Sequence, residues 1–152
     1  MQIKKLFIAS SLLISSLFIP NAAIAQNHGT PGQFDFYVLT LSWSPDYCAT
    51  NGIRDPQQCG SGRKLGFVLH GLWPQYQTGY PANCSTQKLP LEVKRRFANL
   101  YPSPKLYDHE WEKHGTCSGK TPAEYLALSK KLKDAIAIPA AYNRPNKPLR
   151  TT

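Results

Sequence analysis

Ionisable side chains gather in one short segment of the chain, in an arrangement that suits chemistry on a phosphate group. Two imidazoles, two carboxylates and one ammonium group lie within six positions, in the order His109, Glu110, Trp111, Glu112, Lys113 and His114. If the segment is helical, Glu110, Lys113 and His114 are three or four positions apart and share one face. We expect His109 at the start of this helix, where unpaired backbone N–H groups also gather. A base, a carboxylate and a cation on one face can transfer a proton and stabilise negative charge.

Metal binding and a solvated helix end are the two alternatives for this segment. A zinc hydrolase motif, H-E-x-x-H, places its two histidines one helical turn apart. Here His114 follows His109 at a spacing one residue longer, which turns the second ring by about 100° more around the helix. Lys113 would also repel a divalent cation, so we expect no metal and no other cofactor. A solvated helix end would explain one isolated run of charges, but a second histidine motif lies upstream.

The second motif is an apolar run followed by a histidine and two aromatic residues. Phe67-Val68-Leu69 predicts a buried strand over 65–69, and His70 follows directly. Gly71 relaxes the backbone after it, and Trp73-Pro74 places a large aromatic surface in a rigid turn. A lone histidine after a strand is more often a hydrogen-bonded core residue. With both motifs present, one imidazole from each can flank a single phosphorus atom as acid and base.

The two motifs together carry a resemblance to a known family. The segments HGLWPQY at 70–76 and HEWEKHGTC at 109–117 resemble, almost letter for letter, the two active-site segments of the ribonuclease T2 family, which are secreted acid-type endoribonucleases. The stretch 34–48 resembles the first strand of that family and its following Trp-x-x-x-Tyr-Cys. The resemblance extends from about Gln33 to Ile138. It implies an α+β fold with an antiparallel-rich central sheet and flanking helices.

The resemblance also implies a mechanism that needs no metal. His114 would act as general base on the ribose 2′-hydroxyl, and His70 as general acid for the departing 5′-oxygen. Glu110 and Lys113 would stabilise the charge on the phosphorane oxygens, and His109 would help to hold the phosphate. Single-stranded RNA would give 2′,3′-cyclic phosphates and then 3′-phosphates, whereas DNA lacks the nucleophile. We expect a bell-shaped pH profile with a mildly acidic maximum.

Base recognition is expected from three further side chains. Trp73 offers a stacking face, and Tyr80 resembles a family position that sandwiches a base against this tryptophan. Stacking tolerates every base, so we expect broad specificity. Gln75 stands where some members carry an acidic residue that selects a purine, so no purine preference is expected. The alternative for Tyr80 is a partly buried loop aromatic.

The first 25 residues have the pattern of a secretory signal peptide. Lys4 and Lys5 precede the apolar run 6–19, and Ala23-Ile24-Ala25 provides an A-x-A cleavage site. The apolar run is too short to span a bilayer comfortably. We therefore expect export to the periplasm or the outside, with no membrane association after cleavage. The remaining 127 residues (152 − 25) correspond to one domain, which we expect to be a monomer.

Export makes disulfides the expected state of the four cysteines. Cys48, Cys59, Cys84 and Cys117 allow three pairings. The resemblance implies Cys48–Cys59 and Cys84–Cys117, each stabilising by about 2–4 kcal/mol. The second bridge would anchor the catalytic segment. The irregular spacing disfavours a zinc site made of four thiolates.

The charge of the chain is compatible with a polyanionic partner. Eighteen Lys and Arg residues stand against nine Asp and Glu residues, and removal of Lys4 and Lys5 leaves a domain of about +7. Because basic exported proteins bind several kinds of polyanion, this signal is weak by itself. The scattered cations suit salt-sensitive steering of RNA.

Apolar periodicity, turn residues and capping signals predict the remaining elements. They are a strand over 34–41, a loop over 49–63, a loop over 74–90, a helix over 91–100 with Arg95 and Arg96 outward, and a helix from Pro104 to about Gly115. The capping box Thr121-Pro122-Ala123-Glu124 starts a last helix. Its predicted core face holds Tyr125, Leu128, Leu132 and Ile136.

The C-terminus is the main departure from the family. We expect a partial ribonuclease T2-like domain over 26–138, because family members usually continue well past the position of Ile138. The tail 139–152 holds three prolines and no periodic apolar face, so it should be irregular. Two other functions stay open: a catalytically defective relic that binds RNA or a partner, and a periplasmic inhibitor or toxin-like module that uses its charged surface.

Overall fold

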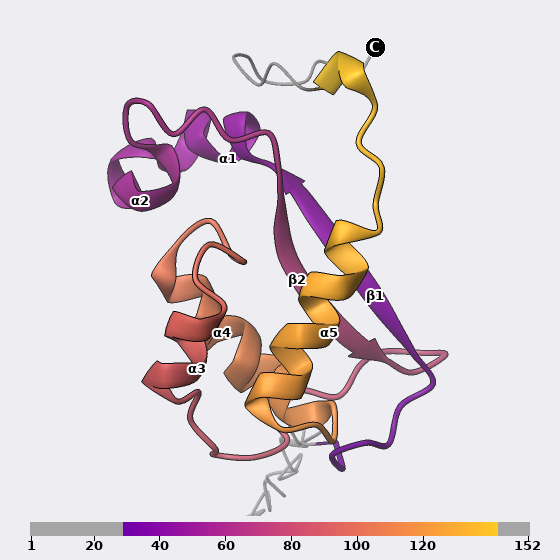
Figure 1. Cartoon of the computed structure of the whole chain (residues 1–152). Coiled ribbons are helices and arrows are strands. Elements are labelled where there is room, and N and C mark those ends of the chain that lie inside the picture. Colours follow the sequence, from indigo (N-terminus) through magenta and orange to yellow (C-terminus); the bar gives the residue numbers. More distant parts are fainter. Residues whose placement is uncertain (1–28, 143–152) are drawn as a thin grey trace, which may run out of the picture.

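The computed structural model describes residues 29–142. The expected signal peptide (1–25) and most of the expected tail (139–152) therefore lie outside the described residues. Figure 1 shows the strands side by side, with the longest helix across them and the other helices beside them or at one end of the strands. The elements are β1 (Phe36–Trp43), α1 (Ser44–Asn51), η1 (Gly52–Arg54), α2 (Pro56–Cys59), β2 (Phe67–Gln75), α3 (Leu91–Arg96), α4 (Pro104–Lys113), η2 (Gly115–Cys117), α5 (Pro122–Asp134) and η3 (Ala140–Tyr142). The predicted α+β class with an antiparallel sheet is confirmed.

The sheet of the described residues consists of β1 and β2 in antiparallel register. Phe36 pairs with Gln75 at one end and Trp43 pairs with Phe67 at the other. An irregularity between Thr40 and Leu41 leaves one extra residue on β2, and the residue without a partner there is His70. Such a bulge bends the strand and redirects a side chain. The backbone of β2 is thus irregular at the first candidate catalytic residue.

Two predictions about this region are wrong. The second strand does not end before His70 with a turn at Trp73-Pro74, because β1 continues to supply partners and β2 extends to Gln75. The segment 49–63 is not a loop throughout, since it contains the end of α1, η1 and α2. Local signals explain α2: Pro56 occupies its first turn, and the Asp55 carboxylate accepts a hydrogen bond from the Gln58 N–H as an N-cap.

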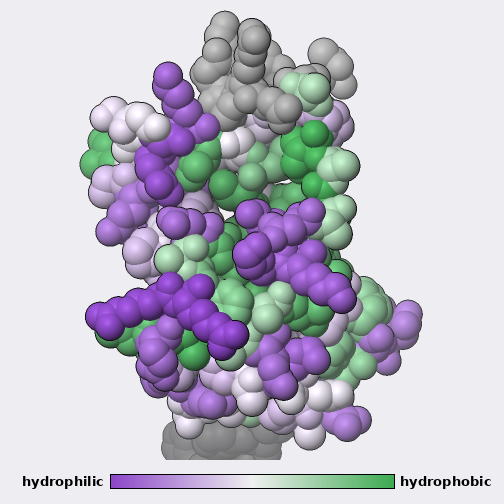
Figure 2. Space-filling model, viewed as in Figure 1, coloured by the Kyte–Doolittle hydropathy of each residue, from purple (hydrophilic) through white to green (hydrophobic). Residues whose placement is uncertain are grey.

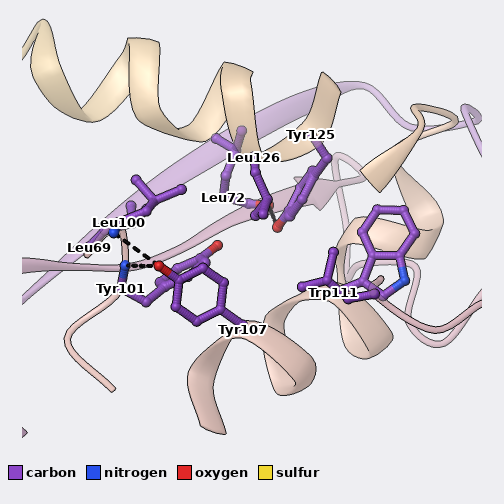
Figure 3. Packing of buried hydrophobic residues seen from close by; sticks show 9 residues of the cluster. Leu69, Leu72, Leu100, Tyr101, Tyr107, Trp111, Tyr125 and Leu126 are labelled. Atoms are coloured by element: carbon purple, nitrogen blue, oxygen red, sulfur yellow. Dashed lines mark hydrogen bonds between the residues drawn. The ribbon is translucent and has the colours of Figure 1, made fainter. Parts of the chain in front are cut away.

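The core lies between the sheet, α4 and α5 (Figure 3). Its largest side chains with almost no exposed surface are Trp111 of α4, Leu69 and Leu72 of β2, and Tyr125 and Leu126 of α5. Tyr125 also donates a hydrogen bond through its hydroxyl to the carbonyl of Leu72, at 2.8 Å. Since both groups are buried, this bond ties α5 to β2 where water cannot replace it.

Helix α5 begins as predicted and ends earlier than predicted. The Thr121 side chain accepts from the Glu124 N–H, and the Glu124 carboxylate accepts from the Thr121 N–H, which confirms the capping box. Leu132 is partly buried against the core. Ile136, however, lies beyond the end of the helix at Asp134 and is 46% exposed, so its predicted place in the core is wrong.

Two disulfides hold the segments around the sheet. Cys48–Cys59 joins α1 to α2, and Cys84–Cys117 joins the long loop after β2 to η2. This is the pairing that the family resemblance implied. The second bridge is reinforced by a hydrogen bond from the Asn83 N–H to the Lys113 carbonyl, at 3.0 Å. The loop that follows β2 is therefore fastened to the C-terminal end of α4.

Replacement of Tyr125 by Phe should destabilise the fold. It leaves the Leu72 carbonyl buried without its partner, and we expect a loss of about 1–3 kcal/mol in the free energy of unfolding. Urea unfolding followed by circular dichroism measures it. The matched control is Tyr142→Phe, because the Tyr142 side chain is 37% exposed. Equal stability of the two variants would contradict the account of this bond.

Candidate active site

One cavity collects all the candidate catalytic and substrate-binding side chains. It has a volume of about 290 Å³, and among the described residues its lining consists of His70, Trp73, Gln75, Tyr80, His109, Glu110, Lys113 and His114. These eight residues are the ones selected from the sequence. The structure brings them together from β2, the following loop and the C-terminal half of α4. Their chemical roles stay predictions.

Strand β2 and helix α4 position the cavity from opposite sides. Alternation along β2 turns Trp73 and Gln75 to one face while Leu72 lies in the core. On α4, Glu110 and Lys113 follow at helical spacing, and His114 caps the helix. The expected position of His109 at the helix start is wrong. The helix begins at Pro104, five residues earlier, so His109 lies in its second half.

Glu110 is the buried centre of the site. Its side chain is 1% exposed, and one carboxylate oxygen, Oε2, accepts a hydrogen bond of 2.8 Å from Nε1 of Trp73. The other oxygen, Oε1, lies 3.8 Å from Nε2 of His70. Burial raises the pKa of Glu110 to about 7, although the Trp73 bond and the Lys113 charge both oppose that rise. At mildly acidic pH the carboxyl group is therefore mostly protonated.

Gly71 makes the approach of α4 to β2 sterically possible. A Cβ atom at this position would lie 2.1 Å from Oε2 of Glu110 and 2.1 Å from Nε1 of Trp73. The prediction that Gly71 relaxes the backbone is wrong, because Gly71 lies within a paired strand and has no positive φ. Its role is to leave room for the hydrogen bond between Trp73 and Glu110.

His114 is the more buried of the two candidate catalytic imidazoles. It is 4% exposed, and its ring stacks on Trp73 with a centroid distance of 5.2 Å and an interplanar angle of 26°. Its Nδ1 atom has no hydrogen-bond partner among residues 29–142. Burial, followed by the charges of Lys113, His109 and His70, lowers the pKa of His114 to about 3. The imidazole therefore stays neutral in mildly acidic solution.

His70 differs from His114 in exposure and orientation. Its side chain is 42% exposed, and its ring meets Trp73 edge-on at 5.5 Å. Partial burial, with the charges of His109 and Lys113, lowers its pKa below the ordinary value of 6.5. Trp73 thus contacts both imidazoles, one with its face and one with its edge.

The predicted stacking of a base between Trp73 and Tyr80 needs a face of Trp73 that another side chain occupies. His114 already stacks on Trp73, while the Tyr80 ring lies 6.2 Å from His114 and 5.8 Å from the ammonium group of Lys113. Tyr80 is nevertheless 49% exposed at the rim of the cavity, and Gln75 lies in its lining. An entering base can reach Tyr80 from solvent.

The composition of the site favours proton transfer and anion binding. It combines three imidazoles, one ammonium group and one carboxyl group, with no thiolate. Among residues 29–142, no three His, Cys, Asp or Glu side chains are grouped so that they could hold a metal ion.

Within the same part of the chain, no helix has the length and apolar character needed to cross a bilayer.

Comparison with known proteins agrees with this geometry. A model of the ribonuclease T2 family matches residues 34–144. The chain belongs to the ribonuclease T2 family. Residues 70–76 and 109–117, which carry the resemblance in sequence, both lie inside the matched range and both contribute to the cavity.

The relatives in this family are longer than the chain. It is 46% identical to a ribonuclease of Aeromonas hydrophila over 130 residues, which cover 86% of this chain and 58% of that protein. It is 35% identical to Ribonuclease 1 of Arabidopsis thaliana over 132 residues, which cover 75% and 55%. The chain spans a little over half the length of these relatives.

Solved structures of ribonucleases resemble the fold. RNase NT in complex with 5′-AMP matches with a TM-score of 0.54 and 28% identity, over 66% of this chain and 56% of that one. Ribonuclease MC1 from the seeds of bitter gourd matches with a TM-score of 0.52 and 28% identity, over 66% and 58%. In both comparisons the similar part covers about two thirds of this chain.

Replacement of Gly71 by Ala should disrupt the contact between β2 and α4. The new methyl group overlaps Glu110 and Trp73, so we expect a loss of about 1–3 kcal/mol in the free energy of unfolding, as for overpacked cores. Gly52→Ala is the matched control, because a Cβ atom there has no neighbour within 4 Å. Chemical denaturation of both variants tests this account. A Gly71→Ala protein as stable as the control would contradict it.

Proposed function

We propose that the chain is an endoribonuclease that cleaves single-stranded RNA by transphosphorylation without a metal ion. The observation that carries this proposal is the convergence of His70 from β2 and His114 from α4 on one cavity. Lys113 supplies positive charge in the same cavity, and the family assignment supports RNA as the substrate class. A 2′-hydroxyl beside a phosphodiester is an internal nucleophile, so positioning and proton transfer are sufficient for the reaction.

The pKa values assign the two histidines to different steps. His114, with its pKa at about 3, is neutral in mild acid and can accept the proton of the 2′-hydroxyl. The 2′-oxygen then forms a bond to phosphorus, and the bond from phosphorus to the 5′-oxygen breaks. His70, which is more exposed, donates its proton to that 5′-oxygen. The products are a 2′,3′-cyclic phosphate and a free 5′-hydroxyl.

Glu110 and Lys113 act on the charge that grows on the phosphorane. An ionised carboxylate would repel the phosphorane oxygens, whereas a carboxyl group with a pKa of about 7 is protonated in mild acid and can donate a hydrogen bond. Its Oε1 atom is buried without a hydrogen-bond partner among the described residues and is free for this contact. Lys113 adds a fixed positive charge, and His109 holds the phosphate.

Hydrolysis of the cyclic phosphate follows with the two proton-transfer roles exchanged. His70 takes a proton from water and His114 returns one to the 2′-oxygen, which leaves a 3′-phosphate. DNA lacks the 2′-hydroxyl and would not be cleaved. Because His114 stacks on Trp73, an entering base would stack on the exposed Tyr80, with a contact from Gln75, which would give broad base specificity.

The two disulfides support export as part of the proposal. Cys48–Cys59 and Cys84–Cys117 would persist in an oxidising compartment. The signal-like segment 1–25 agrees with a periplasmic or extracellular location. We propose a monomer that releases any contact with the membrane once this segment is removed. A catalytically defective relic that binds RNA is the second candidate, because the chain covers a little over half of its relatives.

Replacement of either histidine should abolish RNA cleavage. His70→Ala and His114→Ala each remove one proton-transfer group, and we expect the rate to fall by about 100- to 10,000-fold. Single-stranded RNA is digested in the presence of EDTA, and cyclic phosphates are identified by mass spectrometry. The control is Lys131→Ala, an exposed cation of α5 away from the cavity.

Three results would contradict the enzyme proposal in different ways. Intact RNA with a cooperative unfolding transition of the unmodified chain would favour the binding relic. Activity that EDTA abolishes would instead favour a metal-dependent reaction. Equal activity of the His114→Ala variant and the control would remove His114 from the mechanism.

The pH profile of kcat/KM should be a bell with an acidic maximum. The base must be neutral, so activity rises as the pH passes the pKa of His114 at about 3. The acid must be protonated, so activity falls as the pH passes the pKa of His70, which lies below 6.5. Lys113 lowers both values, so the residual activity of a Lys113→Gln variant should show both limbs at higher pH. If the two limbs of the Lys113→Gln profile lie at the same pH as those of the unmodified chain, Lys113 does not lower the two pKa values.

A further inference from the structure

A second and larger cavity lies at the opposite end of α4 from the candidate active site. Its volume is about 590 Å³, and its lining comes from the segment around α2, from α3 and from the start of α4. None of the eight active-site residues contributes to it. On the face drawn in Figure 2, hydrophilic side chains surround a hollow between the part with α2 and the part with α3. The cavity has its own set of side chains and no role in the proposed reaction.

Positive charge dominates the lining of this cavity. Its ionisable side chains, tyrosines aside, are four cations and one carboxylate: Arg63, Lys94, Arg95, Lys105 and Asp108. Lys94 forms an ion pair with Asp108, and Lys105 forms one with the buried Asp55. Within the described part of the chain no carboxylate forms an ion pair with Arg63 or Arg95. Two guanidinium groups are therefore left to meet an anion.

Arg63 is already held in place at the wall of the cavity. One of its Nη atoms donates to the carbonyl of Pro102, at 3.2 Å. A guanidinium group carries five N–H donors, so this bond leaves several for a ligand. Since Pro102 immediately precedes the N-cap of α4, the bond keeps the positive charge close to the helix start.

The start of α4 adds a polar group without a partner. Ser103 is the N-cap residue, lines the cavity and is 1% exposed, yet its Oγ atom makes no hydrogen bond to the helix or to any other described residue. Buried hydroxyl groups are almost always satisfied, so an exception calls for an explanation. Pro104 at the first helical position has no N–H, and the Leu106 N–H donates to the Ser103 carbonyl, at 3.3 Å. The Lys105 N–H lies between them at the positive end of the helix dipole, which favours an anion.

We propose that this cavity binds a phosphate group, held by Ser103 Oγ, the Lys105 N–H, Arg63 and Arg95. A tetrahedral oxyanion accepts several hydrogen bonds at once, which matches a hydroxyl group, a backbone N–H group and planar guanidinium groups. The phosphate can come from a polynucleotide or from free phosphate. The site does not depend on the ribonuclease activity proposed above.

Helix α4 connects the two cavities, because each cavity lies at one of its ends. The helix carries Ser103 at its start and His114 at its end, and its ten residues span about 15 Å. A polynucleotide that occupies the candidate active site has further phosphates at distances of this order. The phosphate cavity would then hold the strand at a point remote from the bond that is cleaved.

Nuclear magnetic resonance of the backbone amides separates the two cavities. The signals of Lys105 and Leu106 report on the phosphate cavity, and those of Lys113 and His114 report on the candidate active site. Inorganic phosphate should shift the amide signals of Lys105 and Leu106. These shifts should saturate at a phosphate concentration independent of any shift at Lys113 and His114. A single-stranded DNA oligonucleotide, which lacks the 2′-hydroxyl, is the second probe. Shifts of Lys105 with both probes identify a polynucleotide as the source, and shifts with inorganic phosphate alone identify free phosphate.

Matched variants distinguish a built site from diffuse charge. Arg95→Gln should weaken phosphate binding at Lys105 by about tenfold, the loss of one charge-assisted contact. Arg96→Gln removes the same charge from the next position of α3, which does not line the cavity, and should leave binding unchanged. Equal weakening by both variants would overturn the proposal, as would the absence of any response of Lys105 to either probe.

Ser103→Ala tests the unpartnered hydroxyl group. If Ser103 binds the ligand, the variant weakens phosphate binding about fivefold or more. Its stability without phosphate should not fall, because an unpaired buried hydroxyl group does not stabilise the fold. A variant that loses stability while binding phosphate normally would show a merely structural role and would overturn the assignment of Ser103.

Discussion

The close contact between β2 and α4 at Glu110 is the constraint on which the rest of the site depends. A carboxyl group that is 1% exposed needs a partner, and Trp73 provides it with a 2.8 Å hydrogen bond. The contact exists only because Gly71 has no side chain. The antiparallel pairing with β1 holds β2 in register, and the bulge leaves His70 unpaired beside this contact.

The same burial sets the protonation states of the site. Removal from water raises the pKa of Glu110 to about 7 and lowers that of His114 to about 3, so both groups are neutral in mild acid. A neutral imidazole is a base, and a neutral carboxyl group is a hydrogen-bond donor. In the proposed reaction, the more exposed His70 would carry the proton that passes to the leaving oxygen. The burial of Glu110 and His114 therefore gives the two groups the protonation states that the proposed reaction requires.

Much of the site could be predicted from the sequence, because most of its residues lie in two short motifs with distinctive spacing. The motifs identified seven of the eight lining residues, and Tyr80 came from the loop that follows the first motif. Pro104 indicated the start of α4, although the expectation that His109 lies at that start is wrong. The extent of β2 beyond His70 could not be predicted, since it depends on pairing with β1. Nor could the role of Gly71, because a close approach between two elements distant in sequence leaves no local pattern.

His70 and His114 lie in one cavity, and their different burial should give them different protonation states. Nitrogen-15 resonance of the two imidazoles during a pH titration of the full chain measures this most directly. We expect the His114 ring to lose its second proton at a pH of about 3, and the His70 ring to lose its own at a higher pH that is still below 6.5. If His114 instead titrates near the ordinary value of 6.5, its ring is solvated and cannot be the neutral base of the proposed reaction in mild acid.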